Sequence, residues 1–382
     1  MALPNKEANS TVNWRKLARK PFTALGIETP GETARLIWRQ YALGKPYYWS
    51  NFPLVWQIDT NNYCGPKYCG VLCEYCYPQW RIATGKNHYQ EMPMHQIKWI
   101  LENIGRYGGV MRDVKRAGYG WGFYATFLNG DGLTERRLPE ILRYGKKVAP
   151  GIDTQTFTCA TLPENAWMLC DANLDWVCVT LSAHTQELYR KVHRGDKFDK
   201  VLETLRYVTE NRKANQHLEA HYVITKTNFA YMRDWYDFMG REFPEWHRVF
   251  SPLVRSFDNT PSAKAMGDLT LQQQEEAIRK INREAAFWNI ETTCLRQPCV
   301  LFQNASVEAD GTLLQCCNWA DSKIWNYGNV ADYMEQGYTL QDYWKARLAN
   351  KLNNPLCQSC NLRHPQWKQR LDKISINVTV KP

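Results

Sequence analysis

The sequence predicts an α/β protein, in which a parallel sheet or an α/β barrel is followed by a small cysteine-rich segment. Strand-like and helix-like segments alternate between Pro53 and Leu253, which is typical of a parallel sheet or an α/β barrel. From Cys294 onward the pattern changes to short loops, turns and cysteines. The 382 residues are enough for two or three domains, or for one barrel with an appendage.

We expect four regions along the chain. Residues 1–50 form a basic and aromatic extension, 51–260 the α/β region, 261–290 a linker and a helix, and 291–382 the cysteine-rich domain. The expected strands are Pro53–Asp59, Gly122–Leu128, Thr154–Thr158, Trp176–Leu181, Glu219–Thr225 and His247–Leu253. The expected helices are Met94–Gly105, Arg137–Lys147, Pro163–Asp171, Lys197–Arg212 and Tyr231–Glu242. After a polar, linker-like stretch at Asp258–Asp268, we expect Leu269–Asn289 to be helical.

The composition excludes two classes of protein. With 44% hydrophobic and 23% charged residues, the chain is not mainly disordered. No segment approaches the ~18 consecutive apolar residues of a membrane-spanning helix, so we expect no membrane partner. The first 22 residues contain no apolar signal-peptide core, which predicts a cytoplasmic location. The net charge of +10 fits either a solvated surface or attraction to an anionic partner.

The cysteines carry more information than the charge. Their number, 13, is odd, and an odd count without a signal peptide argues against a disulfide framework. Four lie between Cys64 and Cys76, and six lie between Cys294 and Cys360. Clustered thiols in a reducing compartment indicate metal binding.

The first cluster contains Cys69, Cys73 and Cys76, spaced by three and then two residues, shortly after the first expected strand. Three thiolates on one loop can hold three irons of a [4Fe–4S] cluster and leave the fourth iron open for a substrate-like cofactor, whereas electron-transfer clusters usually take four thiolates. A zinc knuckle is the alternative, with Cys64 as the fourth ligand. The position after a strand that opens an α/β region favours the iron–sulfur cluster.

This loop resembles the signature of the radical S-adenosylmethionine (SAM) superfamily, in which an aromatic or apolar residue, here Tyr75, precedes the third cysteine. The resemblance implies a partial (β/α)6 barrel of the TIM type over residues 51–260. It also implies that the open iron binds SAM, whose cleavage by one electron gives a 5′-deoxyadenosyl radical that removes hydrogen from a carbon. An electron donor such as flavodoxin or ferredoxin is the implied partner.

Weaker similarities extend along the expected barrel. Gly130 and Asp131 lie where the family has a Gly-Gly-Glu-Pro-like turn that binds the cofactor's amino group, although a plain Asn-Gly/Asp-Gly turn is the alternative. Thr180 and Ser182 follow the family's fourth-strand pattern and could reach the cofactor. Arg194 could pair with the cofactor carboxylate, or it could be a solvated loop arginine.

The second cluster resembles the C-terminal auxiliary-cluster domain called SPASM, or its shortened twitch form. The similarity rests on Cys299, on Gly311 and Cys316 with four residues between them, and on the closing pair Cys357 and Cys360. It implies that these four thiolates hold a second [4Fe–4S] cluster. Cys294 could replace Cys299, and Cys317 could replace Cys316; a structural zinc site with four cysteine ligands is the alternative.

We therefore expect a radical SAM iron–sulfur enzyme that abstracts hydrogen from a substrate C–H bond. The basic, aromatic residues 1–50 could dock a leader segment, which favours a peptide or protein substrate. A carbohydrate, an aminocyclitol or a nucleoside is the alternative small-molecule substrate. From another class, a zinc-stabilised nucleic-acid-binding protein would also use positive charge and aromatic residues, but we do not expect nucleic acid as the partner.

Overall fold

The structure is a computed structural model. It describes residues 53, 55–85, 88–108, 121–126, 129–252, 261–282, 286–287, 304–315 and 326–351. The expected extension at residues 1–50 lies outside these ranges, and so do all six cysteines of the second cluster.

A ten-stranded sheet organises the described residues, in the order β10-β9-β8-β1-β2-β3-β4-β5-β6-β7. Every pairing from β8 through β1 to β7 is parallel, whereas β8, β9 and β10 pair antiparallel. The strands are β1 Val55–Ile58, β2 Gly122–Ala125, β3 Asp153–Thr158, β4 Trp176–Thr180, β5 His217–Ile224, β6 His247–Pro252, β7 Ala286–Phe287, β8 Asn304–Val307, β9 Thr312–Leu314 and β10 Asn326–Asn329. The parallel run β1 to β6 confirms the expected partial (β/α)6 barrel of the TIM type.

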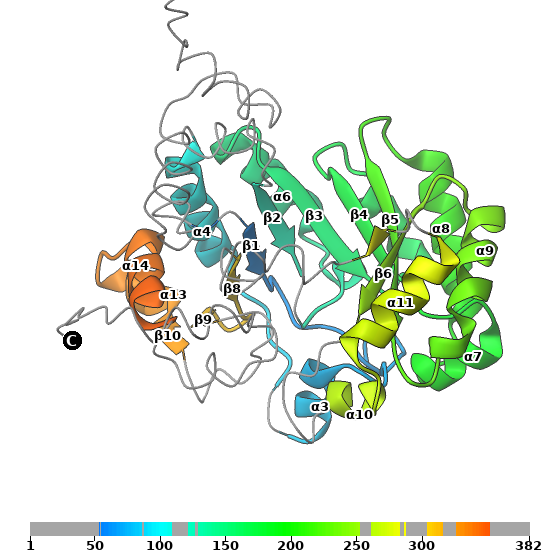
Figure 1. Cartoon of the computed structure of the whole chain (residues 1–382). Helices are drawn as coiled ribbons and strands as arrows, with labels where there is room; N and C mark the ends of the chain where they lie inside the picture. Colours follow the sequence, from blue (N-terminus) through cyan, green and yellow to red (C-terminus); the bar gives the residue numbers. More distant parts are fainter. Residues whose placement is uncertain are drawn as a thin grey trace, which may run out of the picture.

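Helices alternate with these strands and cover the outside of the sheet (Figure 1). They form because apolar residues recur at helical spacing: α4 buries Ile97, Ile100, Leu101 and Ile104 on one side. The α-helices are α3 Tyr77–Ala83, α4 Met94–Arg106, α6 Leu138–Val148, α7 Gln186–Val192, α8 Phe198–Asn211, α9 Met232–Glu242, α10 Pro261–Met266, α11 Leu271–Ile281, α13 Val330–Glu335 and α14 Leu340–Lys351. The described residues also form three 3₁₀ helices, η1 Gly132–Thr134, η2 Pro163–Cys170 and η3 Phe229–Tyr231.

The two faces of the sheet have different chemistry. On the outer face, Phe123 of β2 packs toward α6, and the ring of Tyr222 of β5 lies 4.8 Å from that of Trp235 in α9. Because side chains alternate along a strand, Tyr124 and His221 lie on the opposite, inner face. The outer face is therefore the apolar core, and the inner face carries polar and aromatic groups.

Three expected elements differ from the structure. Residues 261–266 of the expected linker form α10. The expected helix Leu269–Asn289 is shorter: α11 ends at Ile281 because Asn282 adopts an extended backbone, and β7 follows at Ala286. The segment after Pro163 is 3₁₀ rather than α-helical. In addition, β8 pairs with β1, so the sheet runs from the expected barrel into the expected cysteine-rich domain.

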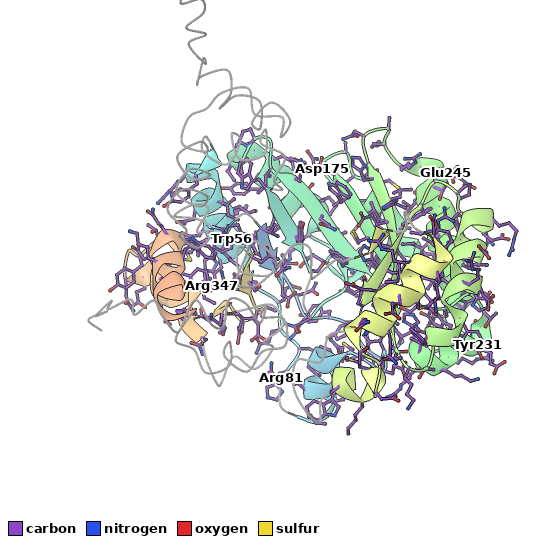
Figure 2. All side chains as sticks on the ribbon, in the orientation of Figure 1. Trp56, Arg81, Asp175, Tyr231, Glu245 and Arg347 are labelled. Carbon is purple, nitrogen blue, oxygen red and sulfur yellow. The ribbon has the colours of Figure 1, made fainter. Side chains whose placement is uncertain are left out.

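The two ends of the parallel strands can be located in Figure 2, where Asp175 directly precedes β4 and Arg81 belongs to α3, after the cysteine loop. These residues lie at opposite ends of the sheet. Arg81 forms a buried ion pair with Glu308, at 3.5 Å, which joins α3 to the residue that follows β8. In the described part of the chain, no helix is both long enough and apolar enough to span a bilayer.

Candidate functional site

A tight turn shapes the first half of the cysteine loop after β1. The carbonyl of Gly65 accepts hydrogen bonds from three amides, those of Tyr68, Cys69 and Gly70, at 3.1, 3.0 and 3.0 Å. Gly65 has a φ of +80°, a left-handed conformation that favours glycine. The turn directs the Gly65 amide at the sulfur of Cys69, at 3.0 Å. A backbone donor aimed at sulfur stabilises the thiolate form.

Two further cysteines approach Cys69. The sulfur of Cys64 lies 3.2 Å from that of Cys69, and the sulfurs of Cys64, Cys69 and Cys159 all lie within 4.8 Å of one another. Hydrogen bonds with the Cys159 and Cys64 thiols lower the pKa of Cys69 to about 3. The low pKa favours the thiolate form of Cys69.

His193 connects the second cysteine of the loop to the end of β4. Its Nε2 lies 3.1 Å from the amide nitrogen of Ser182, and its Nδ1 lies 3.2 Å from the sulfur of Cys73. Because an amide can only donate, Nε2 is the unprotonated nitrogen and Nδ1 carries the proton. Burial lowers the pKa of His193 to about 3, so the ring is neutral near pH 7. Nδ1–H therefore donates to the Cys73 sulfur.

Backbone contacts hold the same part of the loop against the end of α7. The amide of Leu72 donates to the His193 carbonyl at 3.0 Å, and the amide of Glu74 donates to the Val192 carbonyl at 2.8 Å. At Gly195 a β-carbon would lie 2.7 Å from the Gly70 carbonyl oxygen, so a side chain there would push the two segments apart. The position of Cys73 is thus fixed by main chain on both sides.

Tyr75 and Cys76 lie at the end of the loop. The ring of Tyr75 is half-buried, with its centroid 6.4 Å from that of His193 in an edge-on arrangement. Cys76 is the N-cap residue of α3, and its amide donates to the Cys73 carbonyl at 3.0 Å. Burial raises the pKa of the Cys76 thiol to about 12, so its thiolate needs a positive partner such as a metal.

The turn after β2 packs directly on the cysteine loop. Asn129 donates from its backbone amide and its side chain to the carboxylate of Asp59, at 3.1 and 2.5 Å. A β-carbon at Gly130 would lie 2.3 Å from the carbonyl oxygen of Asn61, so glycine is needed for this close approach. The side chain of Gln79 donates to the Asn129 carbonyl at 2.9 Å and fastens α3 to the turn.

Asp131 is held by donors from its own chain. Its carboxylate accepts hydrogen bonds from the Leu133 amide at 2.9 Å, the Thr158 hydroxyl at 2.7 Å, and the amide and thiol of Cys159 at 2.7 and 2.9 Å. Burial and the negative charge of Cys69 raise the pKa of Asp131. The three contacts with Thr158 and Cys159 join the turn after β2 to the end of β3. All four contacts occupy the lone pairs that the expected ammonium contact would use.

The residues after β4 have different surroundings. Thr180, on the inner face at the end of β4, is half-buried and lies opposite His221. Ser182 is fully buried; its hydroxyl accepts from the Val223 amide at 3.0 Å, and its carbonyl accepts from the side chain of Asn228 at 3.1 Å. Thr180 is therefore open to a ligand in the barrel, whereas Ser182 is engaged within the protein.

Arg194 lines a cavity of about 450 Å³ at this end of the barrel. Lys226 and Lys264 also line it, together with Glu74 of the cysteine loop. Three cationic side chains against one carboxylate give the cavity a positive balance, which suits an anionic group such as a carboxylate.

Backbone strain gathers at the same edge of the sheet. Thr126, Ala160 and Arg194 have φ values of +52°, +58° and +52°, unusual for residues with a side chain. Thr126 directly follows β2, and Ala160 lies two residues after the end of β3. Arg194 lies two residues after the end of α7, in the loop that contacts Cys73. Strain of this kind costs about 1–3 kcal/mol per residue and is typically found at functional sites.

The expected auxiliary cluster cannot be described at its ligands, because Cys299, Cys316, Cys357 and Cys360 lie outside the described residues. The turn between them is described. Gly311 has a φ of +86°, and its carbonyl accepts a hydrogen bond from the Val330 amide at 2.9 Å. Gly311, the glycine of the expected auxiliary-cluster motif, is therefore packed against the Gly-Asn turn that ends β10.

Sequence reasoning missed two residues of this site. Cys159 lies outside both cysteine clusters of the sequence, and His193 belongs to none of its motifs. A signal existed for Cys159, since it directly follows β3 and so lies at the same sheet edge as the cysteine loop. No comparable signal existed for His193, because it lies 120 positions after Cys73 and approaches it only in the folded chain.

The donors present suit an iron–sulfur cluster. Cys69, Cys73 and Cys76 come from one loop at the edge where the parallel strands end, and N–H groups are already directed at the first two sulfurs. Iron–sulfur clusters are held by thiolates and tuned by such hydrogen bonds.

Comparison with known proteins agrees with this chemistry. Residues 65–239 match the family model of the Radical SAM superfamily. Streptococcus suis SuiB bound to S-adenosylmethionine has a similar fold, with a TM-score of 0.57, 15% identity, and coverage of 82% of this chain and 71% of SuiB. For SuiB bound to the precursor peptide SuiA, the TM-score is 0.54 and the identity 15%, with coverage of 77% of this chain and 65% of SuiB.

At this identity, the likeness to SuiB concerns the fold alone. No curated protein matches the chain in sequence. The family match covers the cysteine loop and the strands β2 to β5 whose ends surround it. Residues 65–239 are therefore similar to the radical SAM domain, which is found in enzymes that use S-adenosylmethionine and an iron–sulfur cluster.

Proposed function

We propose that this protein is a radical SAM enzyme that abstracts hydrogen from a substrate bound inside the barrel, with Cys69, Cys73 and Cys76 as the ligands of its SAM-binding [4Fe–4S] cluster. The observation that carries the proposal is the surroundings of the cysteine loop. Residues that follow β2, β3, β4 and β5 all converge on this loop or on its immediate contacts, so the loop lies at the mouth of the barrel.

When bound, the reduced cluster supplies the electron that splits SAM into methionine and a 5′-deoxyadenosyl radical. The chain's own task is to orient the cofactor and exclude water. We assign Thr180 and Tyr75 to contacts with the cofactor, and Arg194 to its carboxylate, because the Arg194 cavity is cationic. Asp131 shapes the turn that contains Gly130. An ammonium group of the cofactor that binds there would share the Asp131 carboxylate with the protein donors.

His193 holds Cys73 in place and donates to its sulfur. A neutral donor of this kind favours the more electron-rich cluster and therefore eases its reduction. We propose an electron donor such as flavodoxin or ferredoxin as the partner that supplies the electron.

A second [4Fe–4S] cluster on Cys299, Cys316, Cys357 and Cys360 is part of the proposal. Its support is the spacing of these cysteines and the packing of Gly311 against Val330. Because β8 and β9 connect this part of the chain to β1, a cluster there would be attached to the barrel by the sheet.

For the substrate, we propose a peptide or protein. The basic and aromatic composition of residues 1–50 suits an acidic or aromatic leader segment. SuiB, which shares the fold, binds the precursor peptide SuiA. A gene for a short precursor peptide beside the gene of this protein would support the proposal, and neighbouring genes for sugar-nucleotide enzymes would favour the carbohydrate, aminocyclitol or nucleoside alternative.

A zinc site is the second candidate for the cysteine loop, because the Cys64 sulfur lies 3.2 Å from that of Cys69. The test is the electron paramagnetic resonance spectrum of the reduced protein with and without SAM. A [4Fe–4S] signal that changes on addition of SAM supports the proposed function. A loop that holds zinc gives no such signal and contradicts it.

A further inference from the structure

A second group of metal-ligating side chains lies on the inner face of the barrel, outside the cysteine loop. Cys178 of β4 is the register partner of Glu219 of β5, and His221 follows two residues later on the same face. Their ligand atoms all lie within 4.8 Å of one another. Cys178 is fully buried and His221 is 7% exposed, so this is an interior group and not a surface cluster.

The spacing suits one small divalent ion. The Cys178 sulfur lies 3.5 Å from Oε2 of Glu219, and Nε2 of His221 lies 2.9 Å from the same oxygen. Zinc bonds of ~2.3 Å to sulfur and ~2.0–2.1 Å to nitrogen or oxygen place tetrahedral ligands ~3.3–3.6 Å apart. The three side chains therefore need only small movements to share an ion.

Supporting contacts for such an ion are already present. The side-chain amide of Gln155 donates to the Cys178 sulfur at 2.7 Å, which would stabilise a thiolate ligand. Nδ1 of His221 lies 3.1 Å from the hydroxyl of Ser251. If Nε2 binds the metal, Nδ1 carries the proton and donates to that hydroxyl, the usual arrangement for a histidine ligand.

Binding of a divalent ion requires one proton to leave the group. Burial and the charge of Glu219 raise the pKa of Cys178, so without a metal its thiol is protonated and donates to the carboxylate. Burial opposes ionisation of Glu219, yet the hydrogen bond with His221 favours its carboxylate form, and its pKa is lowered overall. Binding of a divalent ion releases one proton, from Cys178, and moves the imidazole proton from Nε2 to Nδ1.

A cavity of about 240 Å³ adjoins the group and is lined by Gln155, Glu219 and His221, with aromatic residues such as Tyr124 and Phe157. No lysine or arginine is among the described residues that line it. Three protein ligands beside a cavity leave one coordination position for a water or a ligand atom, as in catalytic zinc sites.

We propose that Cys178, Glu219 and His221 bind a zinc-class divalent ion on the inner face of the barrel, with its fourth position open to an oxygen or sulfur atom of a ligand in the adjoining cavity. This site is separate from the cysteine loop and does not depend on radical chemistry. The cavity is also lined by Gly122, Asp153 and Trp176, the first residues of β2, β3 and β4, so this ligand lies toward the end of the barrel opposite the cysteine loop and carries a carboxylate, carbonyl or thiol group.

The test measures zinc and iron per chain in the full-length, iron-loaded protein after dialysis against Zn²⁺ and removal of loosely bound metal. Wild type should retain one zinc. Cys178→Ser and His221→Gln should lose it and keep their iron. The matched controls are Cys170→Ser, a cysteine in η2, and His217→Gln, an exposed histidine on the same strand; both should retain the zinc.

Zinc X-ray absorption identifies the ligands and separates this site from the cysteine loop. One sulfur and otherwise nitrogen or oxygen neighbours are expected, whereas zinc on the loop would show three or four sulfurs. If Cys178→Ser loses iron as well, Glu219→Gln, which keeps the side-chain shape, decides in its place. No zinc in wild type, zinc retained in the variants, or a sulfur-rich shell would each overturn the proposal. Iron content and SAM cleavage report on the proposed function separately.

Discussion

The hydrogen bond from His193 to the Cys73 sulfur should raise the reduction potential of the SAM-binding cluster. Two substitutions separate this effect from the structural role of the ring. His193→Gln places an amide near the position of Nε2, so it can still accept from the Ser182 amide but loses the donor to Cys73. His193→Asn places an amide near Nδ1, so it can keep the donor and loses the contact with Ser182.

The size of the effect follows from the loss of a charged hydrogen bond. Such a bond is worth about 1.5–3 kcal/mol, and it is stronger to the reduced, more negative cluster. If about 1 kcal/mol differs between the two oxidation states, the potential of His193→Gln falls by about 40 mV, since 59 mV corresponds to about 1.4 kcal/mol for one electron. His193→Asn should keep its potential but lose about 1–3 kcal/mol of stability, because the buried Ser182 amide has no acceptor.

Potentiometric titration followed by electron paramagnetic resonance gives the midpoint potential, and denaturant unfolding gives the stability. A potential in His193→Gln equal to that of wild type would refute the reasoning. So would equal shifts in both variants, because His193 would then act only through the shape of the loop.

Three further predictions concern other parts of the molecule. Asp131→Ala should lower the free energy of unfolding by about 1–3 kcal/mol for each buried donor left unpaired, Thr158 among them. Denaturant unfolding measures this loss, and a loss below about 1 kcal/mol would contradict the hydrogen-bond network. Replacing Cys357 and Cys360 together by Ala should roughly halve the iron from about eight per chain, because only the first cluster remains. Unchanged iron with the loss of one zinc would contradict the auxiliary cluster. Cys64→Ala should leave iron and SAM cleavage largely intact, and a total loss of both would favour a four-cysteine zinc site in the loop.

The sequence predicted the barrel well because its strands are short, buried runs separated by helices with a clear apolar side. All six expected barrel strands exist, and their ends differ by a few residues at most. The region after Leu253 was harder to predict. Its polar residues give no apolar pattern that would predict the short helix α10. The strand β7 consists of only Ala286 and Phe287, which is too short to be predicted from the sequence although it pairs with β6.

The candidate site was predictable where its residues are adjacent in the chain, as in the cysteine loop. It was not predictable where the fold brings distant segments together. Cys159 and His193 reach the loop only through the strand order, and the contact of Cys178 with Glu219 depends on the β4–β5 register. The closed network of donors around Asp131 also depends on tertiary contacts, which is why the spacing alone indicated an open ammonium acceptor.

Formation of 5′-deoxyadenosine tests the central claim most directly. The anaerobically reconstituted and reduced protein is incubated with S-adenosylmethionine, and the products are separated by liquid chromatography and identified by mass. We predict 5′-deoxyadenosine from the wild type and none from Cys69→Ala, Cys73→Ala or Cys76→Ala, because a cluster that lacks one protein ligand is lost or misplaced. Wild-type turnover in Cys73→Ala, or no product from the iron-loaded wild type, would contradict the account.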